Sequence, residues 1–164
     1  MAEFTHDDLM FKPGLMTGER ILITGGGTGL GKVMAEACAM LGADVVIWGR
    51  RGGVVADTAK ELTEHAAKSG GGVVTGQACD IRVPEAIHDT MDEVWAGGVP
   101  TGLVNNAAGN FISRTEDLSS RGFDAIANIV FRGSFFVSQE CGKRWLKEGK
   151  HASVVSIQIG RAHV

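Results

Sequence analysis

Short apolar runs alternate with longer helical stretches along most of the chain. Residues 21–23, 45–48, 103–104 and 154–157 are largely apolar, and residues 73–74 open a similar run that leads to residue 79. Apolar residues recur at helical spacing within residues 30–41, 87–94 and 123–141, and residues 54–68 form a more polar helical stretch. Short, nearly continuous apolar runs are typical of strands that are buried on both faces. The chain is therefore predicted to alternate five strands with helices, with the apolar residues of 123–141 along one helix face.

This alternation predicts the class of fold. Buried strands joined by right-handed helical crossovers form a doubly wound parallel sheet with helices on both faces. We predict a Rossmann-like α/β domain of three layers (α/β/α) over residues 18–158, truncated after its fifth strand and preceded by an extension over residues 1–17. Ligands of such folds bind at the carboxyl ends of the strands, where the strand order reverses. Glycine clusters follow the first and fourth predicted strands, so we expect the site there.

Composition and charge narrow the class of protein further. Of the 164 residues, 44% are hydrophobic and 21% are charged, which is ordinary for a soluble globular domain. The net charge of −3 gives no reason to expect a nucleic-acid or membrane partner, and no apolar run is long enough to span a bilayer. Cys38, Cys79 and Cys141 share no metal-binding or CxxC spacing. We therefore predict no metal site and a reducing, cytoplasmic location.

A glycine-rich segment joins the first predicted strand to the first predicted helix. Gly25 permits a tight turn, Gly29 lets the backbone approach a diphosphate, and Gly31 lets the helix pack against the sheet. The N-terminus of that helix directs N–H groups and partial positive charge at phosphate oxygens. Because a second strand follows, we interpret the segment as a nucleotide-binding loop rather than a turn without a ligand. Its predicted contacts are Gly25, Gly26, Gly27, Thr28, Gly29, Leu30 and Gly31.

The end of the second predicted strand indicates which nucleotide binds. Enzymes that use NAD usually place an acid there to hold the ribose 2′-hydroxyl. Here Arg50 and Arg51 follow Gly49, and a guanidinium suits a 2′-phosphate. We therefore predict NADP(H) as the cofactor, with Arg50 as its main contact. The alternative is a pair of solvated surface arginines.

The end of the third predicted strand carries an acid and an apolar residue. Asp80 is expected to accept a hydrogen bond from the adenine amino group, and Ile81 is expected to lie against the ring. The alternative for Asp80 is a helix cap or a turn residue.

Two motifs resemble the short-chain dehydrogenase/reductase superfamily: the glycine-rich segment at residues 24–31 and the NNAAG run at residues 105–109. A longer match, residues 106–113 with residues 115–116, 118–119 and 79–82, resembles the 2,4-dienoyl-CoA reductases of that superfamily. One departure agrees with this narrower resemblance. Val130 stands where most superfamily members carry an Asn in the long helix, and the dienoyl-CoA reductases also lack that Asn.

The resemblance implies an NADPH-dependent reductase of 2,4-dienoyl-CoA thioesters that is a homo-tetramer when whole. It implies further cofactor contacts from Asn106, Ala107, Ala108 and Gly109. Asn110 would donate a hydrogen bond to the thioester oxygen as it gains charge. The acyl-CoA path would be lined by part of Arg50 together with Arg82, Phe111 and Ser119.

The chemistry of these residues also allows purely structural roles. Asn110 is equally suited to a turn, Ser119 to the N-cap of the long helix, and Phe111 to the core.

The family's catalytic tyrosine is missing from the chain. In the family, a Ser and a Tyr follow the fifth strand and a Lys lies on the next helix, whereas this chain contains no tyrosine. We therefore expect the chain to be inactive alone, and poorly soluble because its fifth strand becomes a sheet edge. Residues 159–164 match one reading frame of a common DNA-sequencing adapter, so we expect a non-native tail. A short-chain dehydrogenase for a carbonyl or alcohol substrate and a non-catalytic nucleotide-binding module are the alternatives.

Overall fold

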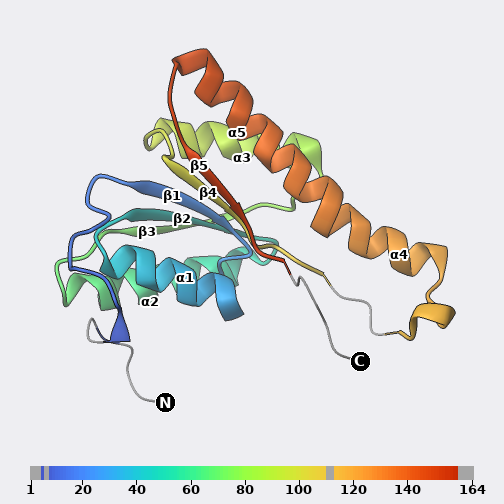
Figure 1. Cartoon of the computed structure of the whole chain (residues 1–164), viewed down its shortest axis with the longest axis horizontal. Helices are drawn as coiled ribbons and strands as arrows, with labels where there is room; N and C mark the ends of the chain where they lie inside the picture. The colour runs from blue at the N-terminus through green and yellow to red at the C-terminus, as the bar shows by residue number, and fades with distance from the viewer. Residues whose placement is uncertain (1–4, 6–7, 110–112, 159–164) are drawn as a thin grey trace.

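Parallel strands form one five-stranded sheet in the computed structural model, which describes residues 5, 8–109 and 113–158 (Figure 1). The strand order is β3-β2-β1-β4-β5, and every neighbouring pair is parallel. The predicted Rossmann-like α/β fold is confirmed. The strands are β1 (Arg20–Thr24), β2 (Asp44–Gly49), β3 (Val74–Ala78), β4 (Gly102–Asn105) and β5 (Ser153–Ser156).

Helices cover both faces of this sheet. In Figure 1, α1 and α2 lie below the strands, and α3 and α5 lie above them. Alternate residues of a strand point to opposite faces of the sheet. Ile21 and Ile23 of β1 therefore join the core between the sheet and helices α1 and α2, while Leu22 joins the core between the sheet and helices α3 and α5. No helix of the described residues is long and apolar enough to cross a membrane. The helical elements are α1 (Gly29–Met40), α2 (Gly52–Ala67), α3 (Pro84–Ala96), a short 3-10 turn (Thr115–Asp117), α4 (Ser120–Ala127), a π-helical segment (Asn128–Gly133) and α5 (Ser134–Glu148).

The strand order reverses at β1. The chain passes from β1 to β2 on one side, and β4 pairs with β1 on the other side. The loops that leave the carboxyl ends of β1 and β4 therefore lie next to each other. This is where the two glycine clusters were expected to meet.

The long helical region differs from the prediction that its apolar residues share one face. Val137 and Cys141 of α5 are completely buried, whereas Phe123 of α4 and Val130 of the π segment are 61% and 45% exposed. A π turn accommodates one residue more than an α turn. The side chains that precede it are therefore rotated relative to those that follow, and the single predicted face is divided.

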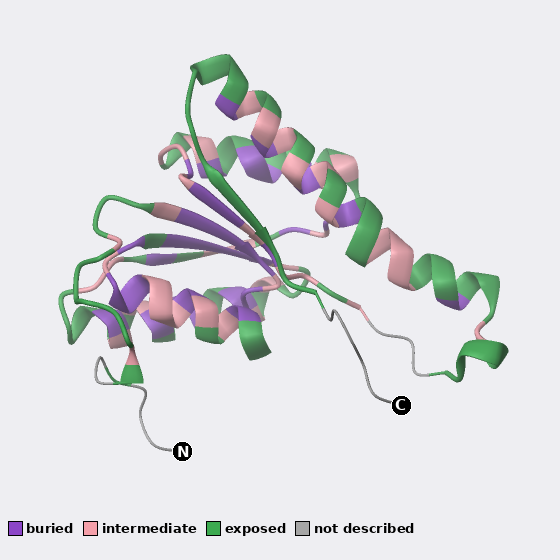
Figure 2. Cartoon of the chain, in the orientation of Figure 1, coloured by how far each residue is buried: buried purple, intermediate pink, exposed green. Residues whose placement is uncertain are grey.

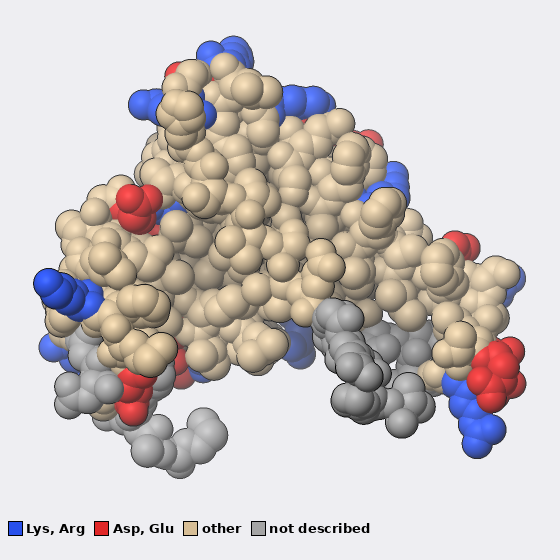
Figure 3. Space-filling view, viewed as in Figure 1, with Lys and Arg blue, Asp and Glu red and all other residues tan. Residues whose placement is uncertain are grey.

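Strand β5 forms an exposed edge of the sheet, as predicted. It pairs with β4 on one side, and Figure 2 shows the strand as exposed. Val154 and Val155 are 50% and 51% exposed. Figure 3 shows the molecule in the orientation of Figure 1. Charged side chains gather at the margins of the visible surface, and its middle is mostly uncharged. An uncharged strand edge is a template for pairing with another chain.

We therefore expect the chain to self-associate, and a Val154→Lys/Val155→Lys variant to shift the population toward monomer, because lysine opposes edge-to-edge pairing. Sedimentation velocity at several concentrations measures this. Val33→Lys is a matched control, since Val33 is also 51% exposed but lies on α1. A wild-type chain that stays monomeric and melts in one sharp transition would contradict the expectation.

Candidate functional site

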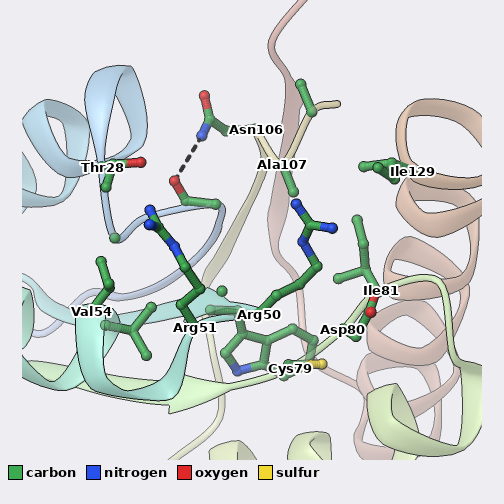
Figure 4. A pocket seen from close by; sticks show the side chains of 16 residues that line it. Thr28, Arg50, Arg51, Val54, Cys79, Asp80, Ile81, Asn106, Ala107 and Ile129 are labelled. Atoms are coloured by element: carbon green, nitrogen blue, oxygen red, sulfur yellow. Dashed lines mark hydrogen bonds between the residues drawn. The ribbon is translucent and has the colours of Figure 1, made fainter. Parts of the chain in front are cut away.

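A cleft of about 480 Å³ opens at the carboxyl ends of the strands, between the loops that follow β1, β2, β3 and β4 (Figure 4). Its position is the one expected from the strand reversal. The residues that line it are Gly25, Gly27, Thr28, Trp48, Gly49, Arg50, Arg51, Val54, Val55, Cys79, Asp80, Ile81, Asn106, Ala107, Ala108 and Ile129.

The glycine-rich loop has a backbone that only glycine accommodates at two points. Gly25 and Gly29 have φ angles of +68° and +55°, in the left-handed region that disfavours side chains. A Cβ atom at Gly25 would also lie 2.9 Å from the Cα atom of Ala107. The loop then enters α1 at Gly29, and the first turn of a helix has N–H groups without partners inside the helix. Backbone N–H groups at a helix N-terminus are suited to binding phosphate oxygens.

Hydrogen bonds hold this loop to the NNAAG segment. The amide Nδ2 of Asn106 donates to the carbonyl oxygens of Thr24 (3.1 Å) and Gly25 (3.3 Å). The buried hydroxyl of Thr24 accepts from the backbone N–H groups of Asn106 (3.1 Å) and Ala107 (3.0 Å). These contacts fix the two loops as one wall of the cleft. The sequence singled out Asn106 and Ala107 but assigned no function to Thr24.

Several of the predicted cofactor contacts do not line the cleft. A Cβ at Gly26 would lie 2.5 Å from Ile47, and one at Gly31 would overlap the carbonyl oxygen of Gly25. Leu30 is 70% exposed. Gly109 lies against Ile129, whose Cδ1 would be 2.5 Å from an added Cβ. Gly26 and Gly31 shape the loop through close packing, while Gly25, Gly27 and Thr28 line the cleft itself.

The end of β2 contributes two arginines. Figure 4 shows both guanidinium groups rising into the cleft, with Arg51 on the side of Thr28 and Arg50 on the side of Ala107. Among the described residues that line the cleft, Asp80 is the one acid. The predicted Arg50 is therefore placed at the cleft, and Arg51, which the sequence analysis did not select, is placed there too.

Asp80 lines the cleft after β3 and forms an ion pair with Arg82. Both carboxylate oxygens accept from Arg82, at 2.9 Å and 3.1 Å from Nε and 2.5 Å between Oδ2 and Nη2. The hydrogen bonds from Arg82 lower the pKa of Asp80 below its ordinary value, against a weaker opposing effect of burial. Asp80 therefore stays ionised and able to accept further hydrogen bonds. Ile81 lines the cleft beside it.

The wall also contains apolar residues that the sequence analysis missed. Trp48 is fully buried, and its indole N–H donates to Gln77 at 2.9 Å. Burial raises the pKa of the Cys79 thiol to about 11, so Cys79 contributes a neutral side chain. The remaining members, Val54, Val55 and Ile129, come from α2 and the π segment. The periodicity of the sequence marked Val54 only as the start of a helix.

The substrate residues implied by the resemblance are placed only in part. Asn110 and Phe111 lie outside the described residues. The hydroxyl of Ser119 accepts from the backbone N–H of Gly122 at 3.1 Å, which makes Ser119 the N-cap of α4. Arg82 lies beside the cleft with its guanidinium paired to Asp80. Among the residues that the structure describes, no cluster of three or more His, Cys, Asp or Glu side chains forms a metal site.

A family comparison agrees with this geometry. The sequence profile described as "short chain dehydrogenase" matches residues 19–163. The chain belongs to the short-chain dehydrogenase family. Members of this family bind a nicotinamide cofactor.

Three relatives illustrate the likeness. A probable 2,4-dienoyl-CoA reductase of Caenorhabditis elegans is 42% identical over 93% of this chain and 49% of its own length. A peroxisomal 2,4-dienoyl-CoA reductase of Danio rerio is 34% identical over 96% of this chain and 50% of its own length. The solved structure of a citronellol catabolism dehydrogenase from Pseudomonas aeruginosa superimposes with a TM-score of 0.82 at 34% identity, covering 93% of this chain and 61% of that one. The chain thus spans about half the length of these curated relatives.

Proposed function

We propose that this chain is the nucleotide-binding part of an NADPH-dependent reductase of 2,4-dienoyl-CoA thioesters. The observation that carries the cofactor assignment is the pair of arginines at the end of β2, in a position where an NAD enzyme usually has an acid. A planar guanidinium forms two parallel hydrogen bonds with phosphate oxygens. Arg50 and Arg51 together would hold the 2′-phosphate.

The other residues of the cleft fit the rest of the nucleotide. The loop from Gly25 to Thr28 and the start of α1 would hold the diphosphate. Asp80, kept ionised, would accept from the adenine amino group, and Ile81 would lie against the ring. The nicotinamide, when bound, supplies a hydride to the substrate.

The substrate residues are part of the same proposal. The side-chain N–H of Asn110 would donate to the thioester oxygen as negative charge develops on it, and a donor placed in this way lowers the barrier to hydride addition. Phe111, Ser119 and Arg82 would line the path of the acyl-CoA. The cap of Ser119 on α4 is compatible with this, because the bond to Gly122 uses the hydroxyl as an acceptor and leaves its proton available.

The chain by itself is proposed to be inactive. It contains no tyrosine, the residue that donates a proton to substrate in the family that it resembles. We therefore expect the chain to bind NADPH, which is measured by the change in nicotinamide fluorescence. We expect no oxidation of NADPH when 2,4-hexadienoyl-CoA is added. A chimera tests the substrate assignment. It joins residues 1–157 to the part of the C. elegans relative that follows the corresponding strand.

The chimera is expected to oxidise NADPH with 2,4-hexadienoyl-CoA. Asn110→Ala in the chimera is expected to lower kcat by about a hundredfold, the usual effect of losing an oxyanion donor. Ser113→Ala, a few residues further along the same segment, is the matched control. A chimera that reduces ketones and not the dienoyl thioester would favour a carbonyl reductase instead. One that binds NADPH but reduces neither would contradict the proposed reaction.

A further inference from the structure

The π segment contacts both loops that would hold the nucleotide. Ile129 lines the cleft and packs against Gly109 of the loop after β4. Gly133 packs against the loop after β3, where an added Cβ would lie 2.8 Å from the Cδ1 atom of Ile81 and 3.0 Å from its carbonyl oxygen. One widened helical turn therefore bridges two sides of the cleft, and such turns are frequent at functional sites.

Arg132 lies in this turn and makes its one long-range polar contact among the described residues. Its Nη1 donates to the carbonyl oxygen of Arg82 at 3.1 Å. The guanidinium lies over the ring of Phe136, 5.0 Å from its centroid, and this contact restricts its orientation. The guanidinium of Arg132, which belongs to the π segment, thus holds the backbone of the loop after β3.

That loop carries the groups assigned to the adenosine half of the cofactor. Arg82 forms the ion pair with Asp80, and its backbone N–H also donates to Asp80 Oδ1 at 3.1 Å. The backbone N–H of Val83 donates to the carbonyl oxygen of Asp80 at 3.0 Å. Displacing the carbonyl of Arg82 would loosen all three contacts, because they belong to one tight turn.

We propose that Arg132 is a positioning residue that holds the loop of residues 80–82 in the conformation that receives the adenosine half of NADP(H). The inference rests on the proposed cofactor. Preorganisation of a loop strengthens binding because the entropic cost of ordering is met before the ligand arrives. The contribution of Arg132 is therefore expected in binding of the adenosine half and not in binding of the nicotinamide half.

The test uses the whole chain and two halves of the cofactor as probes. Arg132→Met keeps the aliphatic stem over Phe136 but removes the donor. We expect it to weaken binding of 2′,5′-ADP by about tenfold, as for the loss of a charged donor, and to leave binding of reduced nicotinamide mononucleotide unchanged. Arg132→Lys retains a donor and should recover part of the affinity. Arg121→Met, at an exposed arginine of α4, is the control.

Hydrogen exchange gives a readout that does not depend on affinity. The amides of Arg82 and Val83 should exchange faster in Arg132→Met, while amides of the central strands stay protected. A variant that binds 2′,5′-ADP as tightly as the wild type, or that weakens both probes equally, would overturn the role of Arg132 alone. A wild-type chain that binds neither 2′,5′-ADP nor NADPH would instead refute the proposed function, and the inference with it.

Discussion

Gly31→Ala is expected to abolish tight binding of NADPH. Gly31 lies in the first turns of α1, where a methyl group would overlap the carbonyl oxygen of Gly25 and lie 2.6 Å from Asn106 Nδ2. Neither neighbour yields easily. The oxygen belongs to the backbone of the phosphate loop, and the amide is held by its bonds to Thr24 and Gly25. Relief of the overlap must therefore separate α1 from the two loops that form the cleft.

Such a separation affects binding more than folding. Overpacking of this kind costs about 1–3 kcal/mol of stability, whereas misplacing the loop removes several phosphate hydrogen bonds at once. We expect the dissociation constant for NADPH to rise by at least about a hundredfold, corresponding to about 2.8 kcal/mol. Fluorescence titration measures the binding, and thermal denaturation of the same sample measures the stability.

Gly142→Ala is the matched control for this substitution. Gly142 is also a helical glycine, in α5, but an added Cβ there meets no atom within 4 Å. The change should leave NADPH binding intact and stabilise the helix by about 0.5–1 kcal/mol. A Gly31→Ala variant that binds NADPH as well as the wild type would show that the loop of residues 25–31 does not hold the diphosphate.

Removing both arginines at the end of β2 is expected to reverse the preference for NADPH. An Arg50→Ala/Arg51→Ala variant loses the cations that face the cleft, and the acid that remains there, Asp80, disfavours a phosphate. A hydrogen bond to a charged group contributes about 1.5–3 kcal/mol. We therefore expect NADPH binding to weaken by about a hundredfold or more, and NADH binding to change little because NADH lacks the 2′-phosphate.

The single variants divide the effect between the two side chains. Titrations of Arg50→Ala and Arg51→Ala with both nucleotides show which guanidinium contacts the phosphate, and Arg114→Ala, at an exposed arginine outside the cleft, is the control. A wild-type chain that prefers NADH would contradict the assignment. Equal losses for NADH and NADPH in the double variant would indicate that the arginines bind the shared diphosphate instead.

The short apolar runs and the glycines determined most of the fold. Runs such as residues 45–48 are short, apolar and rich in β-branched residues, which favours buried strands, so the local pattern predicts the alternating order of a doubly wound sheet. The glycine-rich loop was recognisable because a left-handed backbone at Gly25 and Gly29 restricts the residue type directly. Arg50 was predicted to lie at the site for a similar reason, since its place follows from the end of a strand.

Only the tertiary structure decided which of these residues meet. Thr24 and Asn106 are far apart in sequence and touch because β4 pairs with β1. The contact of Arg132 with Arg82 likewise depends on how the π segment packs against the loop after β3, and on a helical irregularity that rotates one face of the helix against the next. Hydrophobic periodicity records whether a residue is buried. The partner of a side chain is set by strand order and helix rotation, which no local pattern contains.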